Sequence, residues 1–329
     1  MKIALMTSQV ARAGFFIQRL GDRLKGEGIE VGCVVVDDNQ TKRACLAGHV
    51  LSVAKRQAKV AGSSLSGALL RLVAFRLLSS AGRRYENRAV AGLPNAIPSV
   101  RVSSLNSAEA VNAVRAHDCD ATCLLGGRIL TKSTIQELGH VLLNGHASDP
   151  RFVRGRPPVF WEALDGHRHI CLTVHQVVPR LDAGPIYGQR LQEILYCGGI
   201  GATIDATMRQ ARVRMTDLLA EVLIGMRAGT IVPMEFRPGP VRTLPRVSQL
   251  IRAEIVCRRR SRRMNRHSSP LPALHPLHRL RPYTDGERVA EGRVRGIQGH
   301  SPVTLKMPDS GGPGCASPSS TQPEFEGLV

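Results

Sequence analysis

Short apolar runs of β-type residues alternate with helical patterns over the first 230 residues, and this alternation restricts the fold more than any other feature of the chain. The runs at 2–8 (KIALMTS) and 30–38 (EVGCVVVDD) enclose a helical pattern at 15–25, which gives a β-α-β opening. Further strand and helix patterns alternate at 100–104, 106–117, 121–127, 131–139 and 141–146. We therefore predict an α/β domain over 1–230, with a parallel-rich twisted sheet and helices on both faces.

The segments after 146 are expected to complete this domain. Residues 157–166 begin with prolines and end with glycine, as helices tend to. Runs at 171–178 and 186–194 predict a strand pair around a loop at 179–185. A long amphipathic helix is predicted at 203–228, where it would close the domain.

A basic, amphipathic and helical pattern at about 44–87 interrupts the alternation. We interpret it as an insertion that packs the leucine face of 69–78 (LLRLVAFRLL) on the domain, in preference to a helix that lies on a membrane surface. Arg71 and Arg76 interrupt this run, which is about half of the ~20 residues that a membrane span needs. No transmembrane helix is expected.

The net charge of +19 and the pI near 10.6 favour an anionic partner, such as nucleic acid, a membrane surface or a phosphorylated substrate, without choosing among them. The eight cysteines are scattered and show no zinc-ligand spacing, so we predict a reducing compartment and no metal site. The start of the chain shows no signal-peptide pattern, and we expect a cytoplasmic protein.

The composition changes after residue 230. Pro, Ser, Gly and Arg become dominant, and Cys257 to Arg266 (CRRRSRRMNR) form a dense basic run. We predict a basic linker or partial helix at 231–267 and disorder at 268–329, where few large apolar residues could offset chain entropy. Removal of the chain from near Met234 to Gly239 onward is accordingly expected to leave the domain intact.

Polar residues gather where the predicted strands end. Asn144 and His146 are two residues apart at the end of a strand, so both side chains point to one face at the carboxyl edge of the sheet. The set continues with Arg154-Gly155, Trp161, Thr173-Val174-His175 and the loop 181–186 (LDAGPI). Trp161 is interpreted as helix packing, and His167, His169 and His175 as solvated loop histidines instead of metal ligands.

This set resembles the formyltransferases that use 10-formyltetrahydrofolate, which include glycinamide ribonucleotide, methionyl-tRNA and amino-sugar formyltransferases. Their pattern is Asn-x-His, then Arg-Gly about eight residues later, then Asp-x-Gly on a loop, and 36 residues separate His146 from Asp182 as in the family. The stretch Gly126 to Leu130 looks like the family's folate-pocket strand end. The resemblance covers about 1–228 and implies a Rossmann-like formyltransferase fold, the donor 10-formyltetrahydrofolate, a primary amine acceptor and no metal.

The resemblance also implies roles for particular residues. The amide of Asn144 would stabilise the oxyanion of a tetrahedral intermediate, which elsewhere contributes about 3 kcal/mol per donor. His146 would carry a proton, and Asp182 would orient His146, favour its charged form and accept a proton from the amine. Main-chain groups at two segments would hold the pterin of the donor: Arg128, Ile129 and Leu130, and Val178, Pro179, Arg180 and Leu181.

Several alternatives stay open at this stage. Asp149 to Arg151 replace apolar residues of the family pattern and Gly145 replaces a β-branched one, so the rival hypothesis is a catalytically degraded, basic nucleic-acid-binding protein. The run Arg258 to Arg266 is either a solvated tail or a weak, non-specific nucleic-acid contact. A methionyl-tRNA enzyme would carry a folded β-rich C-terminal domain that this tail does not resemble, so a small amine such as an amino sugar is favoured. A homo-oligomer is compatible with the sequence.

Overall fold

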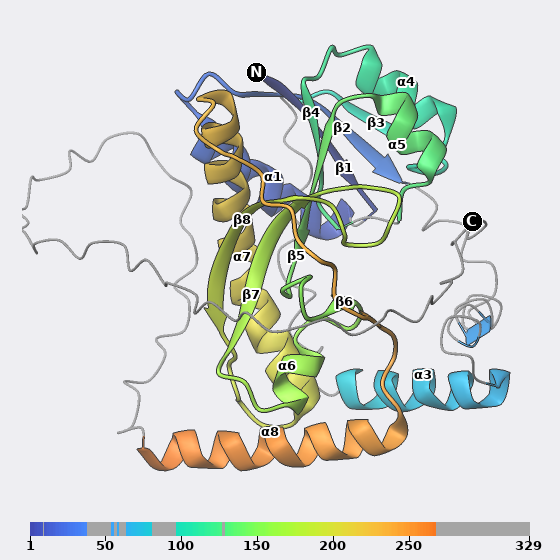
Figure 1. Ribbon diagram of the computed structural model, residues 1–329, viewed down its shortest axis with the longest axis vertical. Helices are drawn as coiled ribbons and strands as arrows, with labels where there is room; N and C mark the ends of the chain where they lie inside the picture. The colour runs from blue at the N-terminus through green and yellow to red at the C-terminus, as the bar shows by residue number, and fades with distance from the viewer. Residues whose placement is uncertain are drawn as a thin grey trace, which may run out of the picture. The chain divides into compact units, whose positions relative to one another are not determined.

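A twisted sheet with helices on both faces forms the centre of the computed structural model, which describes residues 1–8, 10–37, 54–55, 58, 64–80, 97–126 and 129–267 (Figure 1). The sheet has seven strands in the order β3-β2-β1-β4-β5-β7-β8. Their bounds are β1 Lys2–Thr7, β2 Glu30–Asp37, β3 Ser99–Val102, β4 Ala121–Leu124, β5 Val141–His146, β7 His169–Gln176 and β8 Ile186–Glu193. Strands β1 to β5 are parallel, and β7 is antiparallel to both of its neighbours. The predicted α/β architecture is confirmed.

The helices divide between the two faces because strand side chains alternate in direction. Ile3 and Leu5 of β1 join the hydrophobic cluster formed with α1 and α7, whereas Ala4 and Met6 join the cluster formed with α4 and α5. The helices are α1 Val10–Leu24, α3 Leu65–Ser80, α4 Ala108–Arg115, α5 Lys132–Leu138, α6 Phe160–Leu164, α7 Ile200–Arg227 and α8 Val247–His267. Each fully buried Leu or Ile side chain in these clusters contributes about 1.5–3 kcal/mol. None of the described helices is long and apolar enough to cross a lipid bilayer.

Helix α3 is the main described part of the predicted insertion, and much of the insertion lies outside the described residues. It packs against α7 and α8 through one side, where Ala68 and Leu72 are buried. Its other side is exposed and carries Leu65, Leu69, Leu70 and Val73. The expectation that the insertion packs its leucine face on the domain is therefore met only on the side of Leu72.

The chain continues to pack on the domain after residue 230. Met234 pairs with Ile186, and the short strand β9 (Val241–Arg242) pairs in parallel with β6 (Arg154–Gly155). Helix α8 then places Leu250, Ala253 and Cys257 in the hydrophobic core. Residues 1–269 form one compact unit, so it extends well past the boundary expected at 230 and takes in the partial helix expected within 231–267. The disorder predicted for 268–329 lies outside the described residues.

The only acidic residue of α8 has a structural role. One carboxylate oxygen of Glu254 accepts the main-chain N–H of Ile200 at 2.8 Å, at the first residue of α7. The N-cap residue of α7, Gly199, has no side chain to accept a hydrogen bond from the first turn, and a carboxylate at this position also interacts favourably with the helix dipole. Helix α8 therefore stabilises the start of α7 as well as covering the core.

Candidate active site

Three elements meet at the carboxyl edge of the sheet. Strand β5 ends with Asn144 and His146, and the antiparallel pairing with β7 places His175 directly opposite Asn144. The loop between β7 and β8 then returns over this edge and carries Asp182. Open α/β sheets bind ligands at this edge, so the predicted residues lie where a site is expected.

Asn144 and His175 are joined by a hydrogen bond. Nδ1 of His175 lies 2.8 Å from the main-chain oxygen of Gln176, which can only accept, so Nδ1 carries a proton. In its neutral form His175 therefore accepts at Nε2, where Nδ2 of Asn144 lies at 3.2 Å. The amide of Asn144 is oriented by this contact and retains its second N–H for another acceptor.

Asp182 lies between the two histidines. Its carboxylate oxygens are 3.8 Å from Nδ1 of His146 and 3.6 Å from Nε2 of His175, and one oxygen accepts the N–H of Gly155 at 3.0 Å. Burial raises the pKa of Asp182, but the neighbouring imidazoles of His175 and His146 and the Gly155 N–H outweigh it and leave the pKa lowered. Asp182 is therefore ionised at neutral pH.

His146 is buried and holds an unused ring nitrogen. Its Nε2 has no hydrogen-bond partner among the described residues and no exposed surface. Burial lowers the pKa of His146, and this effect exceeds the opposing charge of Asp182, while His175 lowers the pKa further. The side chain is thus neutral at neutral pH. Asp182 alone would favour the charged form of His146, as expected from the sequence, but burial outweighs this effect. A neutral, buried imidazole with a free nitrogen is suited to accept a proton.

The Arg-Gly pair of the sequence pattern holds the Asp182 loop. The guanidinium of Arg154 is buried and donates to the main-chain oxygens of Leu181 at 2.8 Å and Gly239 at 2.6 Å. Gly155 has φ +89°, a conformation that favours glycine, and its N–H binds Asp182. A Cβ at Gly184 would collide with the main-chain oxygen of Gln176, so this glycine lets the loop pass close to β7.

The two departures from the family pattern have local explanations. Gly145 lies under α7, and a Cβ there would stand 2.8 Å from Cγ of Met215, so the methionine occupies the space of the missing side chain. Asp149 forms an ion pair with Arg151 at 2.6 Å and begins a turn by accepting the N–H of Arg151, and its charge is the smallest of the effects that raise the pKa of His146. Neither residue displaces Asn144, His146 or Asp182.

The two segments expected to hold a pterin lie at the same edge. Asn106 fixes the first segment, since its side chain donates to the oxygen of Ile129 at 3.0 Å and accepts the N–H of Thr131 at 2.8 Å. Leu130 is buried and Ile129 is exposed, while Arg128 lies outside the described residues. In the second segment Pro179 and Arg180 are exposed, and Val178 and Leu181 are half-buried. Val177, just before it, packs against the hydrophobic cluster that contains Leu130.

The remaining histidines do not extend the site. His167 and His169 are exposed as predicted, although His169 lies in β7 and not in a loop. The prediction for His175 is wrong, since this residue lies in β7 and is buried in the site, which nothing in the sequence reports. Within the described ranges, no group of His, Cys, Asp and Glu side chains could hold a metal ion.

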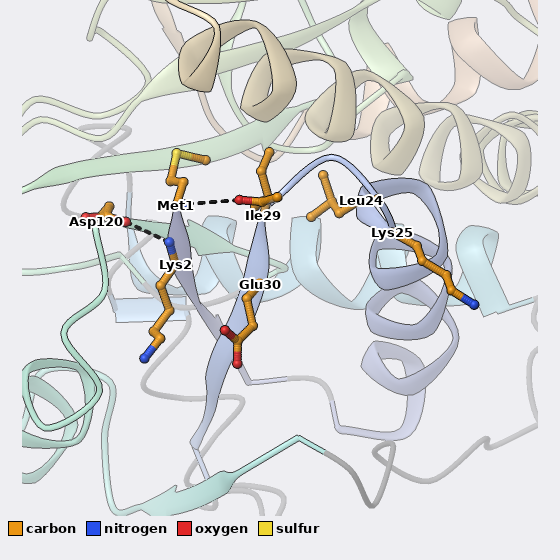
Figure 2. A pocket seen from close by; sticks show the side chains of 9 residues that line it. Met1, Lys2, Leu24, Lys25, Ile29, Glu30 and Asp120 are labelled. Carbon is orange, nitrogen blue, oxygen red and sulfur yellow. Dashed lines mark hydrogen bonds between the residues drawn. The ribbon is translucent and has the colours of Figure 1, made fainter.

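A hollow of about 690 Å³ lies at the opposite, amino edge of the sheet, where Lys2 and Glu30 begin β1 and β2 (Figure 2). There the N–H of Lys2 donates to the carboxylate of Asp120 at 2.6 Å, and the amino group of Met1 donates to the oxygen of Gly28 at 3.0 Å. None of the predicted site residues lines this hollow, and it holds no histidine. The chemistry therefore concentrates at the carboxyl edge.

The comparison with known families agrees with this geometry. A profile described as formyl transferase matches residues 1–214, a range that contains Asn144, His146, His175 and Asp182. The chain belongs to the formyl transferase family.

Individual relatives of this formyl transferase family member match over shorter ranges. The methionyl-tRNA formyltransferase of Listeria welshimeri is 29% identical over 136 residues, which cover 41% of this chain and 44% of that protein. That of Nitratidesulfovibrio vulgaris is 36% identical over 113 residues, covering 33% of this chain and 32% of that protein. The chain thus spans less than half the length of these curated relatives. Glycinamide ribonucleotide transformylase 1 from Symbiobacterium toebii is a similar solved structure, with 16% identity, a TM-score of 0.45 and coverage of 71% of this chain and 94% of that chain.

Proposed function

We propose that this protein transfers a formyl group from 10-formyltetrahydrofolate to a primary amine. The observation that carries the proposal is the cluster of Asn144, His146 and Asp182 at the carboxyl edge of β5, with Nε2 of His146 unused. Membership of the formyl transferase family supports the reaction class and the folate donor. No feature of the described residues favours the nucleic-acid-binding alternative over it.

The residues divide the reaction among them. The amine nitrogen attacks the formyl carbon, and the negative charge that develops on the formyl oxygen is stabilised by the second N–H of Asn144. The attacking nitrogen loses a proton to neutral His146, whose imidazolium is then stabilised by ionised Asp182. The C–N bond to the pterin-linked nitrogen breaks, and that nitrogen takes up a proton from His146. Tetrahydrofolate and the formamide leave, and the enzyme returns to its starting protonation state.

We place the pterin against main-chain groups of 129–130 and 178–181, together with Arg128. Asn106 supports the first segment and Arg154 the second, so both segments are held by side chains that need not touch the donor. Loops that side-chain hydrogen bonds already hold in place lose little conformational entropy when a ligand binds. This arrangement suits a pocket that exists before the donor arrives.

We further propose a small acceptor such as an amino sugar. The relatives named above act on methionyl-tRNA by their names, but the similarity stops short of their full length. The described part of the chain after residue 230 forms one short strand, the two-residue β9, and no β-rich domain. A small amine is therefore the acceptor class that this part of the chain supports best.

Calorimetric titration with a non-transferable analogue of 10-formyltetrahydrofolate, followed by a donor-consumption assay with a panel of amines, tests the proposal. We expect saturable binding to the wild type and turnover with at least one amine. Asn144→Ala should retain binding and lose turnover by roughly 10²–10³-fold. Asn112→Ala, an exposed asparagine on α4, is the matched control and should behave as the wild type. Absence of binding at millimolar analogue would refute the folate assignment.

A further inference from the structure

The exposed side of α3 is largely apolar, with the exposed Ser66 among its leucines. Leu65, Leu69 and Val73 follow one another at helical spacing, and Leu70 beside them is 60% exposed. The helix contains no acidic residue, and its arginines are Arg71 and Arg76. An apolar face of a helix is normally covered, and this face of α3 is left exposed among the residues that the structure describes.

The outer side of α8 combines apolar and cationic residues. Opposite the buried Leu250, Ala253 and Cys257, the helix exposes Ile251 and Ile255, and Ile251 is 56% exposed. The same side exposes four arginines: Arg252, Arg259, Arg262 and Arg263. None of the four has an ion-pair partner among the described residues. The single acid of α8, Glu254, is already bound to Arg258 and to the N–H of Ile200.

These two helices lie side by side at one end of the domain, where they contact each other (Figure 1). We call the exposed sides of α3 and α8 together the α3–α8 surface. It gathers large apolar side chains and unpaired arginines and has no free carboxylate on the described helices that form it. Neither helix contributes a residue to the candidate active site.

We propose that the α3–α8 surface binds to a membrane surface that carries anionic lipids. A helix that lies in the interface buries its apolar side among the lipid chains, and the basic residues around it are attracted to anionic headgroups. The leucines and isoleucines would enter the lipid chains, and the four arginines would be attracted to the headgroups. Neither helix spans the bilayer, so the contact is peripheral and reversible.

Two other partners fit the surface less well. Nucleic acid would use the arginines, but single-stranded bases stack on aromatic side chains, and Leu65, Leu69, Leu70 and Val73 offer no such platform. A second copy of the chain would cover the leucines, but it would bring further arginines against Arg259 and Arg262 without acids to pair them. Anionic lipid offers acyl chains to the apolar residues and negative headgroups to the arginines.

Sedimentation with vesicles tests the proposal on the full chain. Vesicles of phosphatidylcholine alone are compared with vesicles containing a third of phosphatidylglycerol, at low and high salt. We expect binding only to the anionic vesicles, weakened by salt. Each arginine near an anionic surface contributes about fivefold to partitioning, so Arg259→Glu with Arg262→Glu should lower it by more than about 25-fold. Leu70→Glu should lower it by at least tenfold, with Leu70→Ser as the milder variant.

Matched controls separate this surface from the overall charge. Arg209→Glu with Arg214→Glu makes the same charge change on exposed positions of α7, and Val232→Glu adds an acid at a position that is 87% exposed. Both controls should keep most of the binding. Equal binding to neutral vesicles, or equal loss in controls and test variants, would overturn the proposal. So would a Leu70-dependent dimer in gel filtration, or RNA binding that needs Arg259 and Arg262 while vesicles are not bound.

Discussion

Two opposing effects on His146 determine how the candidate site can work. Burial removes water from the imidazole and lowers its pKa, while the carboxylate of Asp182 at 3.8 Å raises it, and burial is the larger effect. The 3.8 Å separation is too long for a direct hydrogen bond, so Asp182 acts on His146 through its charge. In the proposed reaction, His146 is therefore neutral at the start and becomes charged when it takes the proton of the amine.

The protonation of His146 can be followed directly. We expect its imidazole to titrate below 6.5, since burial dominates, and to titrate lower still in Asp182→Asn, since the charge that raises the pKa is removed. The acid limb of kcat/KM, where it reflects the free enzyme, should have its midpoint below 6.5 for the same reason. NMR titration of the ring protons gives the first two values. A His146 midpoint above 6.5 would mean that Asp182 outweighs burial.

His175 is expected to be a positioning residue, acting through Asn144 and Asp182. His175→Ala removes the acceptor of the Asn144 amide at 3.2 Å and one contact of Asp182, and a misplaced group of this kind can cost roughly a hundredfold in rate. The loss should appear in kcat more than in KM. His169→Ala, at the exposed start of the same strand, is the control and should leave both constants unchanged. An equal effect of the two substitutions would exclude the positioning role.

The residues of the site were unequally visible in the sequence. Asn144 and His146 could be placed because a two-residue spacing at a strand end fixes a common direction, and Asp182 because the family pattern fixes its distance along the chain. The position of His175 in the site could not be predicted, because its contacts depend on the antiparallel register of β5 and β7, which no local pattern reports. The buried guanidinium of Arg154 was likewise predicted only as part of a motif, without its bonds to Leu181 and Gly239.

At the scale of elements, the loop between β7 and β8 depends on close packing. Gly184→Ala would place a methyl group against the main-chain oxygen of Gln176, and relief of such overlap costs about 1–3 kcal/mol of unfolding free energy. The loop should shift to relieve this overlap. Because the shift displaces Asp182, turnover should fall. Gly21→Ala in α1 is the control, because nothing lies within 4 Å of its added methyl and the helix should gain about 0.5–1 kcal/mol. Chemical denaturation should show a lower free energy of unfolding for Gly184→Ala and a higher one for Gly21→Ala.

Most elements could be predicted because hydrophobic periodicity reports them directly. Strands β1 to β5, β7 and β8 and helix α7 follow the predicted order, whereas the two-residue strand β6 was predicted only as the Arg-Gly motif. Helix α8 could not be predicted with its packing, because its buried side is only Leu250, Ala253, Cys257 and Ser261 among many arginines. In α3 the leucines occupy more than one side of the helix, so the sequence could not tell which of them the domain would cover.

At the scale of the whole molecule, α8 joins the C-terminal part of the described chain to the core. Truncation after Gly239 removes Leu250 and Cys257 from the core and Glu254 from the start of α7, so it should lower the free energy of unfolding by roughly 3 kcal/mol or more. This reverses the expectation that removal from this point is harmless. Truncation after His267 keeps α8 and should preserve stability and turnover. Thermal unfolding of the two truncated chains decides between the two boundaries.

The most direct test of the central claim is a single measurement of donor turnover. Purified wild-type chain, His146→Ala and the control His169→Ala are each mixed with 10-formyltetrahydrofolate and the best amine of the panel, and release of tetrahydrofolate is followed. The structure predicts turnover by the wild type and by His169→Ala, and a loss of roughly 10²–10⁴-fold in His146→Ala. If the wild type and His146→Ala release tetrahydrofolate at the same rate, the cluster at the end of β5 is not the site of formyl transfer.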